Sequence, residues 1–199
     1  TGAGIGAGSR RFLFDDFSGG TSGTALDGRT PVIGNTWTTL QGSLRLASSE
    51  SNQGARSTAA SFNLGMSTQG LQNYYIEAEV FGYADNGVPN EQAGILFRGN
   101  SSASYYTARL HRDAGGWQIL TGISSNGNFA ELSSNAVTYT TGTSARIAVS
   151  AVSSNVEIWF NNSTVFSFSR DFNTTGQGIG IFIFNGNRGY VADLFAEPR

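Results

Sequence analysis

The 199-residue sequence predicts an all-β fold, a sandwich or barrel of about a dozen short antiparallel strands. Segments of alternating apolar and polar residues follow one another along the chain, and turn signals separate them every ~8–12 residues. The composition agrees, because 39% of the residues are hydrophobic, 12% are aromatic and 27 are glycine. This mixture is typical of a sizeable core built from strands that are joined by tight turns.

The first element is a Gly/Ala-rich stretch, residues 1–10, which predicts a flexible linker or tail before a single domain at 11–199. A glycine-rich loop is expected at 18–37, a turn at Asn161–Thr164 and another around 185–187. A short helix within 131–140 remains an open alternative. The expected strand segments, of which the last two are hairpins, are 11–17, 43–48, 55–64, 74–83, 93–99, 104–113, 116–123, 129–137, 145–152, 155–169 and 178–198. The expected core includes Phe12, Phe14, Tyr106, Leu110, Ile158, Phe160, Ile181 and Ile183.

Charge and composition exclude several functions. The net charge is −2 and no basic run occurs, so nucleic acid and anionic membrane surfaces are poor partners. The chain has no lysine for Schiff-base chemistry and no cysteine for disulfides or thiolate metal sites. No apolar run is long enough for membrane insertion. The sequence starts at Thr1, so we expect a processed or excised fragment with any signal peptide outside it.

Two carboxylates stand out in the segment "YYIEAEVFGY", residues 74–83. Period-two alternation places Tyr75, Glu77 and Glu79 on one strand face, with the two carboxylates ~7 Å apart. Carboxylates at about this separation can hydrolyse glycosidic bonds. The alternative, which we favour, is that they pair with Arg98 or Arg109 across a sheet face.

The order of the segments resembles the concanavalin A-like lectin/glucanase superfamily, in its laminin-G-like jelly-roll branch. The resemblance covers residues 11–196 and rests on "FDDF", "LDGRTPVIGNTW", "YYIEAEV", "AGILFR", "YYTARLHRDAGGWQIL" and the closing "GQGIGIFIFNGNRGYVADLF". It implies a two-sheet antiparallel jelly roll with one concave sheet. Endo-glucanases of this superfamily carry a Glu-x-Asp-x-x-Glu pattern on one strand. Here Glu79 replaces the aspartate and Gly82 the second glutamate, so the catalytic set is incomplete.

Sugar-binding members of this superfamily use the concave face or the loops at its rim. We therefore expect Tyr75, Tyr105, Arg109, His111 and Trp117 to line one concave surface, with Glu77, Glu79 and Arg98 nearby. Aromatic rings would stack on sugar C–H faces and the polar groups would bind hydroxyls. The alternative is that the aromatic residues belong to the core. His111 is the single histidine, which cannot form a zinc site by itself.

Many members also hold a structural Ca²⁺ between sheet edges, and their first and last strands pair. The resemblance therefore implies a possible calcium site in which Asp193 approaches Asp15 or Asp16. The alternative is that these aspartates cap turns or pair with arginines. The loop 84–92, with Asp85, Asn86, Asn90 and Glu91, is either a second binding loop or a polar turn.

Three functions fit these features. The first is a non-catalytic carbohydrate-binding or adhesion domain that docks on a glycan or polysaccharide surface, on a secreted, cell-surface or virion protein. The second is a structural virion or assembly module that contacts other copies or other virion and cell-surface proteins. The third is a glycoside hydrolase that uses Glu77 and Glu79. We favour the first because no complete catalytic set is present.

Overall fold

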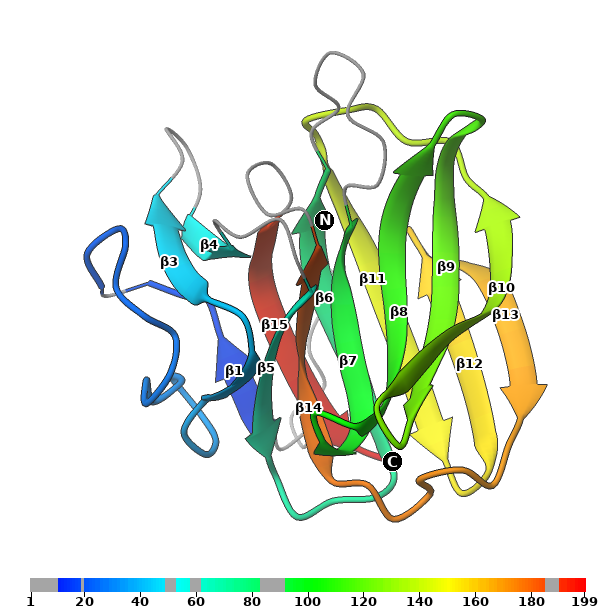
Figure 1. Ribbon diagram of the computed structural model, residues 1–199, viewed down its shortest axis with the longest axis horizontal. Helices are drawn as coiled ribbons and strands as arrows, with labels where there is room; N and C mark the ends of the chain where they lie inside the picture. The colour runs from blue at the N-terminus through cyan, green and yellow to red at the C-terminus, as the bar shows by residue number, and fades with distance from the viewer. Residues whose placement is uncertain (1–10, 19, 49–52, 58–61, 83–91, 185–189) are drawn as a thin grey trace, which may run out of the picture.

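The computed structural model describes residues 11–18, 20–48, 53–57, 62–82, 92–184 and 190–199 (Figure 1). These ranges contain fifteen strands and no helix, which confirms the all-β class. In particular, they contain no helix long and apolar enough to cross a membrane. The strands are β1 (Leu13–Asp15), β2 (Thr38–Gln41), β3 (Leu44–Ser48), β4 (Gln53–Ser57), β5 (Phe62–Thr68), β6 (Tyr74–Phe81), β7 (Gln92–Ser101), β8 (Ser104–Asp113), β9 (Gly116–Ser125), β10 (Asn128–Ala136), β11 (Ser144–Val152), β12 (Asn155–Phe160), β13 (Ser163–Ser169), β14 (Gly178–Phe184) and β15 (Tyr190–Pro198).

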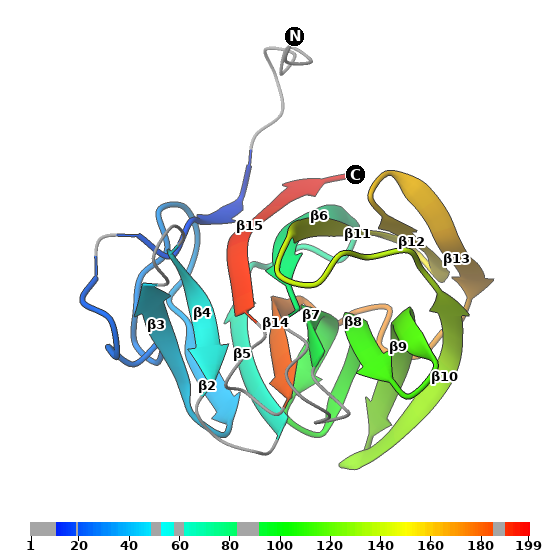
Figure 2. The same ribbon diagram turned by 90° about the horizontal axis from the view of Figure 1, so that it is seen from above.

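The strands form two antiparallel sheets that pack face to face, which confirms the predicted jelly-roll sandwich. The eight-stranded sheet has the order β13-β12-β11-β6-β15-β4-β3, and β1 pairs with β15 at one side of this path. The seven-stranded sheet has the order β10-β9-β8-β7-β14-β5-β2. Figure 2 shows that β2 and β10, at its two flanks, bend away from the other sheet, so that its outer face is concave.

The alternation of β6 was predicted correctly and sets the two faces of the eight-stranded sheet. Tyr74, Ile76, Ala78 and Val80 are buried in the core between the sheets, whereas the residues between them are half-buried on the outer face. From the other sheet, β8 and β14 bring residues such as Ile181 into the same core. Burial of this apolar surface is the main force that holds the sheets together.

Most of the expected core is confirmed, but the first strand has the opposite phase. Tyr106, Leu110, Ile158, Phe160, Ile181 and Ile183 are buried in the main cluster. In β1, however, Leu13 and Asp15 point inward, and Phe14 lies beside Phe195 on the outer face. Phe12 is only partly buried against the core. The prediction placed the apolar Phe12 and Phe14 inward. It was wrong because the inward position next to Phe14 is taken by the carboxylate of Asp15, which is buried although it is polar.

Two strand predictions were wrong in their boundaries. The segment 55–64, expected as one strand, belongs to two: β4 in the eight-stranded sheet and β5 in the seven-stranded sheet. The short strand β2 lies just after the predicted loop 18–37 and was missed. The turn between β12 and β13 was correct, since Asn161 and Asn162 both have positive φ, 47° and 69°, as a tight hairpin turn requires.

Candidate binding face

The residues expected on one concave surface lie on opposite faces of the sandwich. Tyr75, Glu77 and Glu79 are on β6, whose outer side belongs to the eight-stranded sheet. Tyr105, Arg109 and His111 are on β8 of the seven-stranded sheet, whose outer side is concave (Figure 2). The expectation of a shared surface was therefore wrong, because alternation within each strand does not say to which sheet the strand belongs.

Glu77 is engaged in ordinary outer-face contacts. One carboxylate oxygen accepts a 2.7 Å hydrogen bond from the Tyr75 hydroxyl, and the other lies 3.3 Å from Nη1 of Arg146 on β11. Arg146 is also the register partner of Glu79. The predicted pairing of these carboxylates with arginine is thus correct for Glu77, but its partner is neither Arg98 nor Arg109.

Arg98 and Trp117 have structural roles away from the concave face. Arg98 is fully buried in a bulge of β7, with φ of 49°, and its guanidinium donates to the backbone carbonyls of Ser153, Asn155 and Arg170. It therefore ties the seven-stranded sheet to the turns of the other sheet. Trp117 pairs in register with Arg112, on the side of the sheet opposite His111.

Tyr105 belongs to a second hydrophobic cluster on the concave face. Only 4% of the Tyr105 surface is exposed, so it does not form an open stacking platform as expected. Its buried cluster partners come from β5, β7 and β14, and are Leu64, Met66, Leu96 and Phe182. One part of the concavity is therefore filled by the protein's own side chains.

Arg109 lies between two aromatic rings at the centre of this face. Its guanidinium carbon is 4.6 Å from the ring centre of Phe129 on β10 and 4.8 Å from that of Phe182 on β14. Its register partner on β7 is Gly94, where a Cβ would collide with Arg109 itself. The absence of a side chain at Gly94 thus makes room for Arg109, whose Nη2 lies 3.2 Å from Oε1 of Glu131.

A polar row adjoins this cation. Gln92, His111 and Gln118 are register partners on β7, β8 and β9, so their side chains share the concave face. Three buried atoms there, Oε1 of Gln92, Nε of Arg109 and Nδ1 of His111, have no hydrogen-bond partner among the described residues. Buried polar atoms normally have a partner, and a water or ligand is a common explanation where the protein supplies none. We call Gln92, Arg109, His111 and Gln118 the concave polar row.

Burial sets the electrostatics of the row. It lowers the pKa of Arg109 to about 10, against the opposing effect of Glu131, and the guanidinium remains charged at neutral pH. Burial also lowers the pKa of His111, and the nearby charge of Arg109 lowers it further. His111 is therefore neutral at pH 7 and offers one ring nitrogen as an acceptor and the other as a donor.

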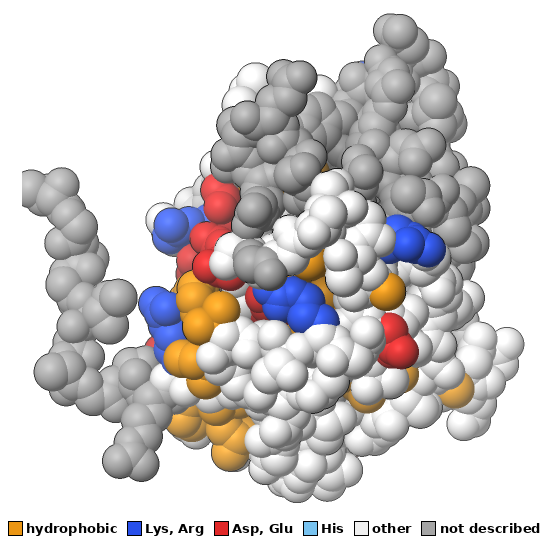
Figure 3. Space-filling model, turned by 90° about the vertical axis from the view of Figure 1, so that its left-hand side faces the viewer, with side chains coloured by type: hydrophobic (Ala, Val, Ile, Leu, Met, Phe, Trp, Pro, Cys, Tyr) orange, Lys and Arg blue, Asp and Glu red, His pale blue; other side chains and the backbone are white. Residues whose placement is uncertain are grey.

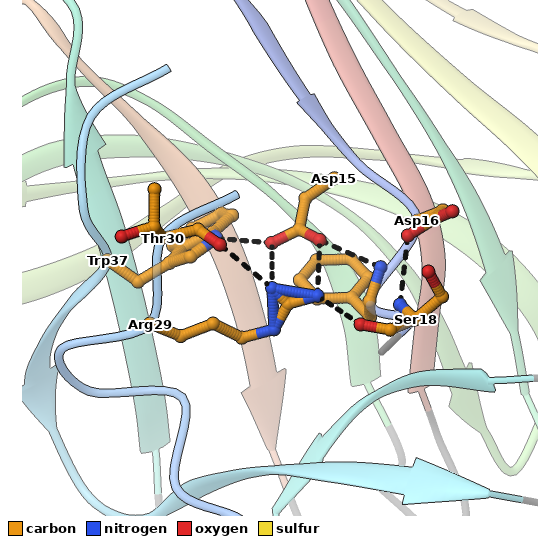
Figure 4. A network of polar contacts seen from close by, with 7 residues as sticks. Asp15, Asp16, Ser18, Arg29, Thr30 and Trp37 are labelled. Carbon is orange, nitrogen blue, oxygen red and sulfur yellow. Dashed lines mark hydrogen bonds and ion pairs between the residues drawn. The ribbon is translucent and has the colours of Figure 1, made fainter. Parts of the chain in front are cut away.

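Asp15, expected as a metal ligand, instead organises a buried polar network at the edge of the sandwich. Figure 3 shows this side of the molecule, where acidic side chains lie next to basic ones. Asp15 accepts hydrogen bonds from the Trp37 indole (2.6 Å) and the Phe17 amide (2.8 Å), and it lies 3.0 Å from Arg29 Nη2 (Figure 4). With both oxygens engaged and a guanidinium beside them, its carboxylate does not fit a calcium ligand.

The other two aspartates of the expected calcium site, Asp16 and Asp193, lie near enough to each other for the charge of Asp16 to act on Asp193. The β1–β15 pairing on which that expectation rested is present, but it places Asp15 opposite Leu194 rather than Asp193. Asp16 accepts a hydrogen bond from the Ser18 amide, and its pKa is lowered mainly by the Ser18 side chain and to a lesser extent by that amide. Asp193 is exposed in a bulge of β15. Partial burial raises its pKa, and the charges of Glu79 and Asp16 raise it further. Within the described ranges no three metal-ligating side chains form a group that could hold an ion.

Sequence reasoning missed Gln92, Gln118, Phe129, Glu131 and Phe182 at the concave face. The sequence predicts a loop at Gln92, and the β7–β8 register is what brings this residue into the row. Residues Asp85, Asn86, Asn90 and Glu91 of the predicted loop lie outside the described residues.

Comparison with known proteins supports the fold. No protein-family model matches the sequence, and no curated protein does. Among solved structures, the carbohydrate-binding module CBM66 from Bacillus subtilis matches with a TM-score of 0.66 and 13% identity, over 82% of this chain and 96% of that one. The CBM2 module of the evolved Dit of Lactobacillus casei BL23 phage J-1 matches with a TM-score of 0.62 and 11% identity, over 95% of both chains. The Emp46p carbohydrate-recognition domain, in its metal-free form, matches with a TM-score of 0.57 and 12% identity, over 80% of this chain and 87% of that one. The chain is therefore similar in fold to jelly-roll sandwiches of this kind.

Proposed function

We propose that this chain is a non-catalytic carbohydrate-binding domain of the concanavalin A-like superfamily, in its laminin-G-like branch. The observation that carries the proposal is the set of unpartnered atoms in the concave polar row, Gln92 Oε1, Arg109 Nε and His111 Nδ1. They combine hydrogen-bond acceptors with a donor. Sugar hydroxyl groups both donate and accept, so they complement such a mixture.

The surroundings of the row support a saccharide as its ligand. Phe184 is the register partner of Gln92, and its half-buried ring extends the row with an apolar surface on which a sugar C–H face can pack. On the other side, the exposed carboxylate of Glu131 lies at the rim. The solved structures of similar fold, among them carbohydrate-binding modules, are consistent with this proposal.

The non-catalytic part of the proposal rests on Glu77 and Glu79. A general acid must be free to reach the glycosidic oxygen of a substrate. Glu77 is instead held by the Tyr75 hydroxyl and by Arg146 on a sheet face. We also propose that the domain belongs to a secreted, cell-surface or virion protein and docks on a glycan or polysaccharide surface.

The test is a glycan-array screen of the domain, run with calcium and again with chelator, on the wild type and two variants. His111→Phe keeps a ring in place but removes both nitrogens, and we expect it to weaken binding about tenfold, the effect of one lost hydrogen bond of about 1.4 kcal/mol. Glu157→Gln, an exposed position on β12 of the other sheet, is the matched control and should bind as wild type. Melting curves and amide spectra establish that both variants are folded.

Two outcomes contradict the proposal. A folded wild-type sample that binds no glycan removes it, and His111→Phe binding as tightly as wild type removes the concave site. If chelator abolishes glycan binding, the domain needs calcium, and the conclusion that Asp15 does not fit a calcium ligand would be wrong.

A second candidate, an assembly module, is favoured by one observation. Val32 and Ile33, which follow one another in the loop between β1 and β2, are 59% and 41% exposed. Exposed apolar neighbours of this kind can mark a protein contact. Sedimentation of the wild type and of Val32→Ser/Ile33→Ser would distinguish the candidates, since an assembly surface predicts self-association that the double variant loses.

A further inference from the structure

A cleft separate from the concave face lies between the loop that joins β1 to β2 and strand β3. Its volume is about 580 Å³, within the range of small-molecule sites. Figure 3 shows this side of the molecule, where basic, acidic and apolar side chains lie close together. The polar residues that line the cleft are Ser18, Thr24, Asp27, Arg29 and Thr30.

The guanidinium of Arg29 is fixed in this cleft by its neighbours. Its terminal nitrogens bond to Asp15, to the Ser18 carbonyl at 2.7 Å and to the Thr30 carbonyl at 3.2 Å (Figure 4). The Nε–H has no partner among the described residues, and the side chain is 14% exposed. Arg29 thus keeps one donor, Nε–H, that no described residue engages, while Asp15 lies beside its charge.

The other polar groups of the cleft complement this donor. Oδ1 of Asp27 accepts a 2.7 Å bond from the Thr39 amide, which orients the carboxylate, and Oδ2 accepts none from the described part of the chain. The hydroxyls of Thr24 and Thr30 are both exposed, and each can donate and accept. Because Asp15 lies beside the charge of Arg29, the carboxylate of Asp27 gives the cleft a negative character that disfavours anionic ligands.

Val32, which is 59% exposed, supplies an apolar edge to the same cleft, whose lining also includes the buried Pro31 and Leu46. The lining and the polar groups are held in fixed positions by main-chain bonds between the loop and the sheet. Gly23 donates to the Leu46 carbonyl at 2.8 Å, and Leu46 donates to the Thr24 carbonyl at 2.8 Å. A site that is formed before the ligand arrives loses less conformational entropy on binding.

We infer that this cleft binds a single neutral sugar residue, as a second saccharide site apart from the concave polar row. Adjacent hydroxyls of the sugar donate to Asp27, another hydroxyl accepts from Nε of Arg29, and the C–H face packs on the exposed Val32. The inference rests on the proposed carbohydrate-binding function and extends it to a site on a different edge of the sandwich.

The test is an NMR titration of the isotope-labelled chain with neutral methyl hexosides, and with glucuronate as the charged comparison. We expect shifts at the amides of Thr24, Asp27 and Thr30 and at Nε–H of Arg29, and weaker shifts or none with glucuronate. Ala25→Trp fills the cleft without removing any of these groups, and it should abolish the shifts. Ala114→Trp, the same change at an exposed position in the β8–β9 turn, should leave them intact.

Asp27→Asn gives a second, milder measurement. It retains the acceptor for the Thr39 amide and should weaken hexoside binding about tenfold through the loss of a charge-assisted bond. The inference is overturned if no hexoside shifts the cleft residues, if glucuronate binds more tightly than the neutral sugars, or if Ala25→Trp leaves the shifts unchanged.

The same variants separate this inference from the proposed function. If no hexoside shifts the cleft residues, while the domain still binds the array and this binding depends on His111, only the inferred second site is wrong. If Ala25→Trp abolishes array binding while His111→Phe does not, the cleft is the principal site and the concave proposal is wrong.

Discussion

Nη2 of Arg109 lies 3.2 Å from Oε1 of Glu131, although the arginine side chain is 1% exposed and the glutamate side chain 56%. The pair therefore joins a desolvated cation to a hydrated anion at the edge of the concave face. We expect Glu131→Gln to destabilise the fold by about 1 kcal/mol, because water screens the attraction at the glutamate. Urea denaturation measures this change, with Glu157→Gln as the exposed control.

Substitution of Asp15 is expected to lower the free energy of unfolding more than substitution of Glu131. Asp15→Ala leaves Arg29 without its counter-charge and the Trp37 indole without its acceptor, so we expect a loss of about 3–5 kcal/mol in the free energy of unfolding. Asp16→Ala, at the neighbouring position, removes a cap on the exposed Ser18 amide and should cost less than about 1 kcal/mol. Equal losses at the two positions would show that the network around Asp15 does not stabilise the fold.

Tyr105 should behave as a core residue. Tyr105→Ala is expected to cost about 3–5 kcal/mol, comparable to Phe160→Ala, because both side chains are buried and their removal leaves a cavity. Thermal and chemical denaturation provide the comparison. A change below about 1 kcal/mol at Tyr105 would show that its side chain is open to solvent, as the sequence alone suggested.

The carboxylates of β6 should be dispensable for any sugar-related activity. Glu77→Gln and Glu79→Gln are expected to leave array binding unchanged, because both side chains lie on the sheet opposite the concave polar row. Assays with a polysaccharide panel should detect no hydrolysis by the wild type. Hydrolysis that either substitution abolishes, in a variant that stays folded, would make the domain an enzyme.

The pH dependence of stability should reflect His111. Its pKa is lowered by burial and by Arg109, with Glu131 and Asp113 acting in the opposite direction, so the unfolded state takes up the proton first as pH falls. Stability should therefore decrease as pH drops below about 6.5, the unfolded value, and level off below the folded pKa. The buried carboxyl of Asp15 has a raised pKa and acts with the opposite sign. Melting temperatures of the wild type and of His111→Phe measure the effect, which the variant should lack.

Much of the fold follows from local patterns in the sequence. The strand β8 begins and ends where alternation predicts, and the turn at Asn161–Asn162 follows from the tolerance of asparagine for positive φ. The prediction of one strand at 55–64 was wrong because this segment contains parts of β4 and β5, which belong to different sheets. No local pattern in the sequence marks the change of sheet.

The candidate site was predictable only in part. Arg109 and His111 share a face by simple alternation on β8, and that part was correct. Gln92, Phe129 and Phe182 join them through the pairing order β10-β9-β8-β7-β14, which brings together residues far apart in the chain. The sheet that Tyr75 occupies depends on the same pairing order, so alternation alone could not separate it from Tyr105.

The first strand, β1, pairs with the last strand, β15, and Leu13 lies opposite Ala196. The two ends of the folded domain are therefore adjacent. The domain is therefore suited to insertion into a surface loop of another protein. The two residues of that loop that flank the insertion would stay close together. For the same reason, a short peptide that joins the two ends would allow new termini to be opened in an exposed turn such as the one between β8 and β9, a circular rearrangement that leaves both sheets intact.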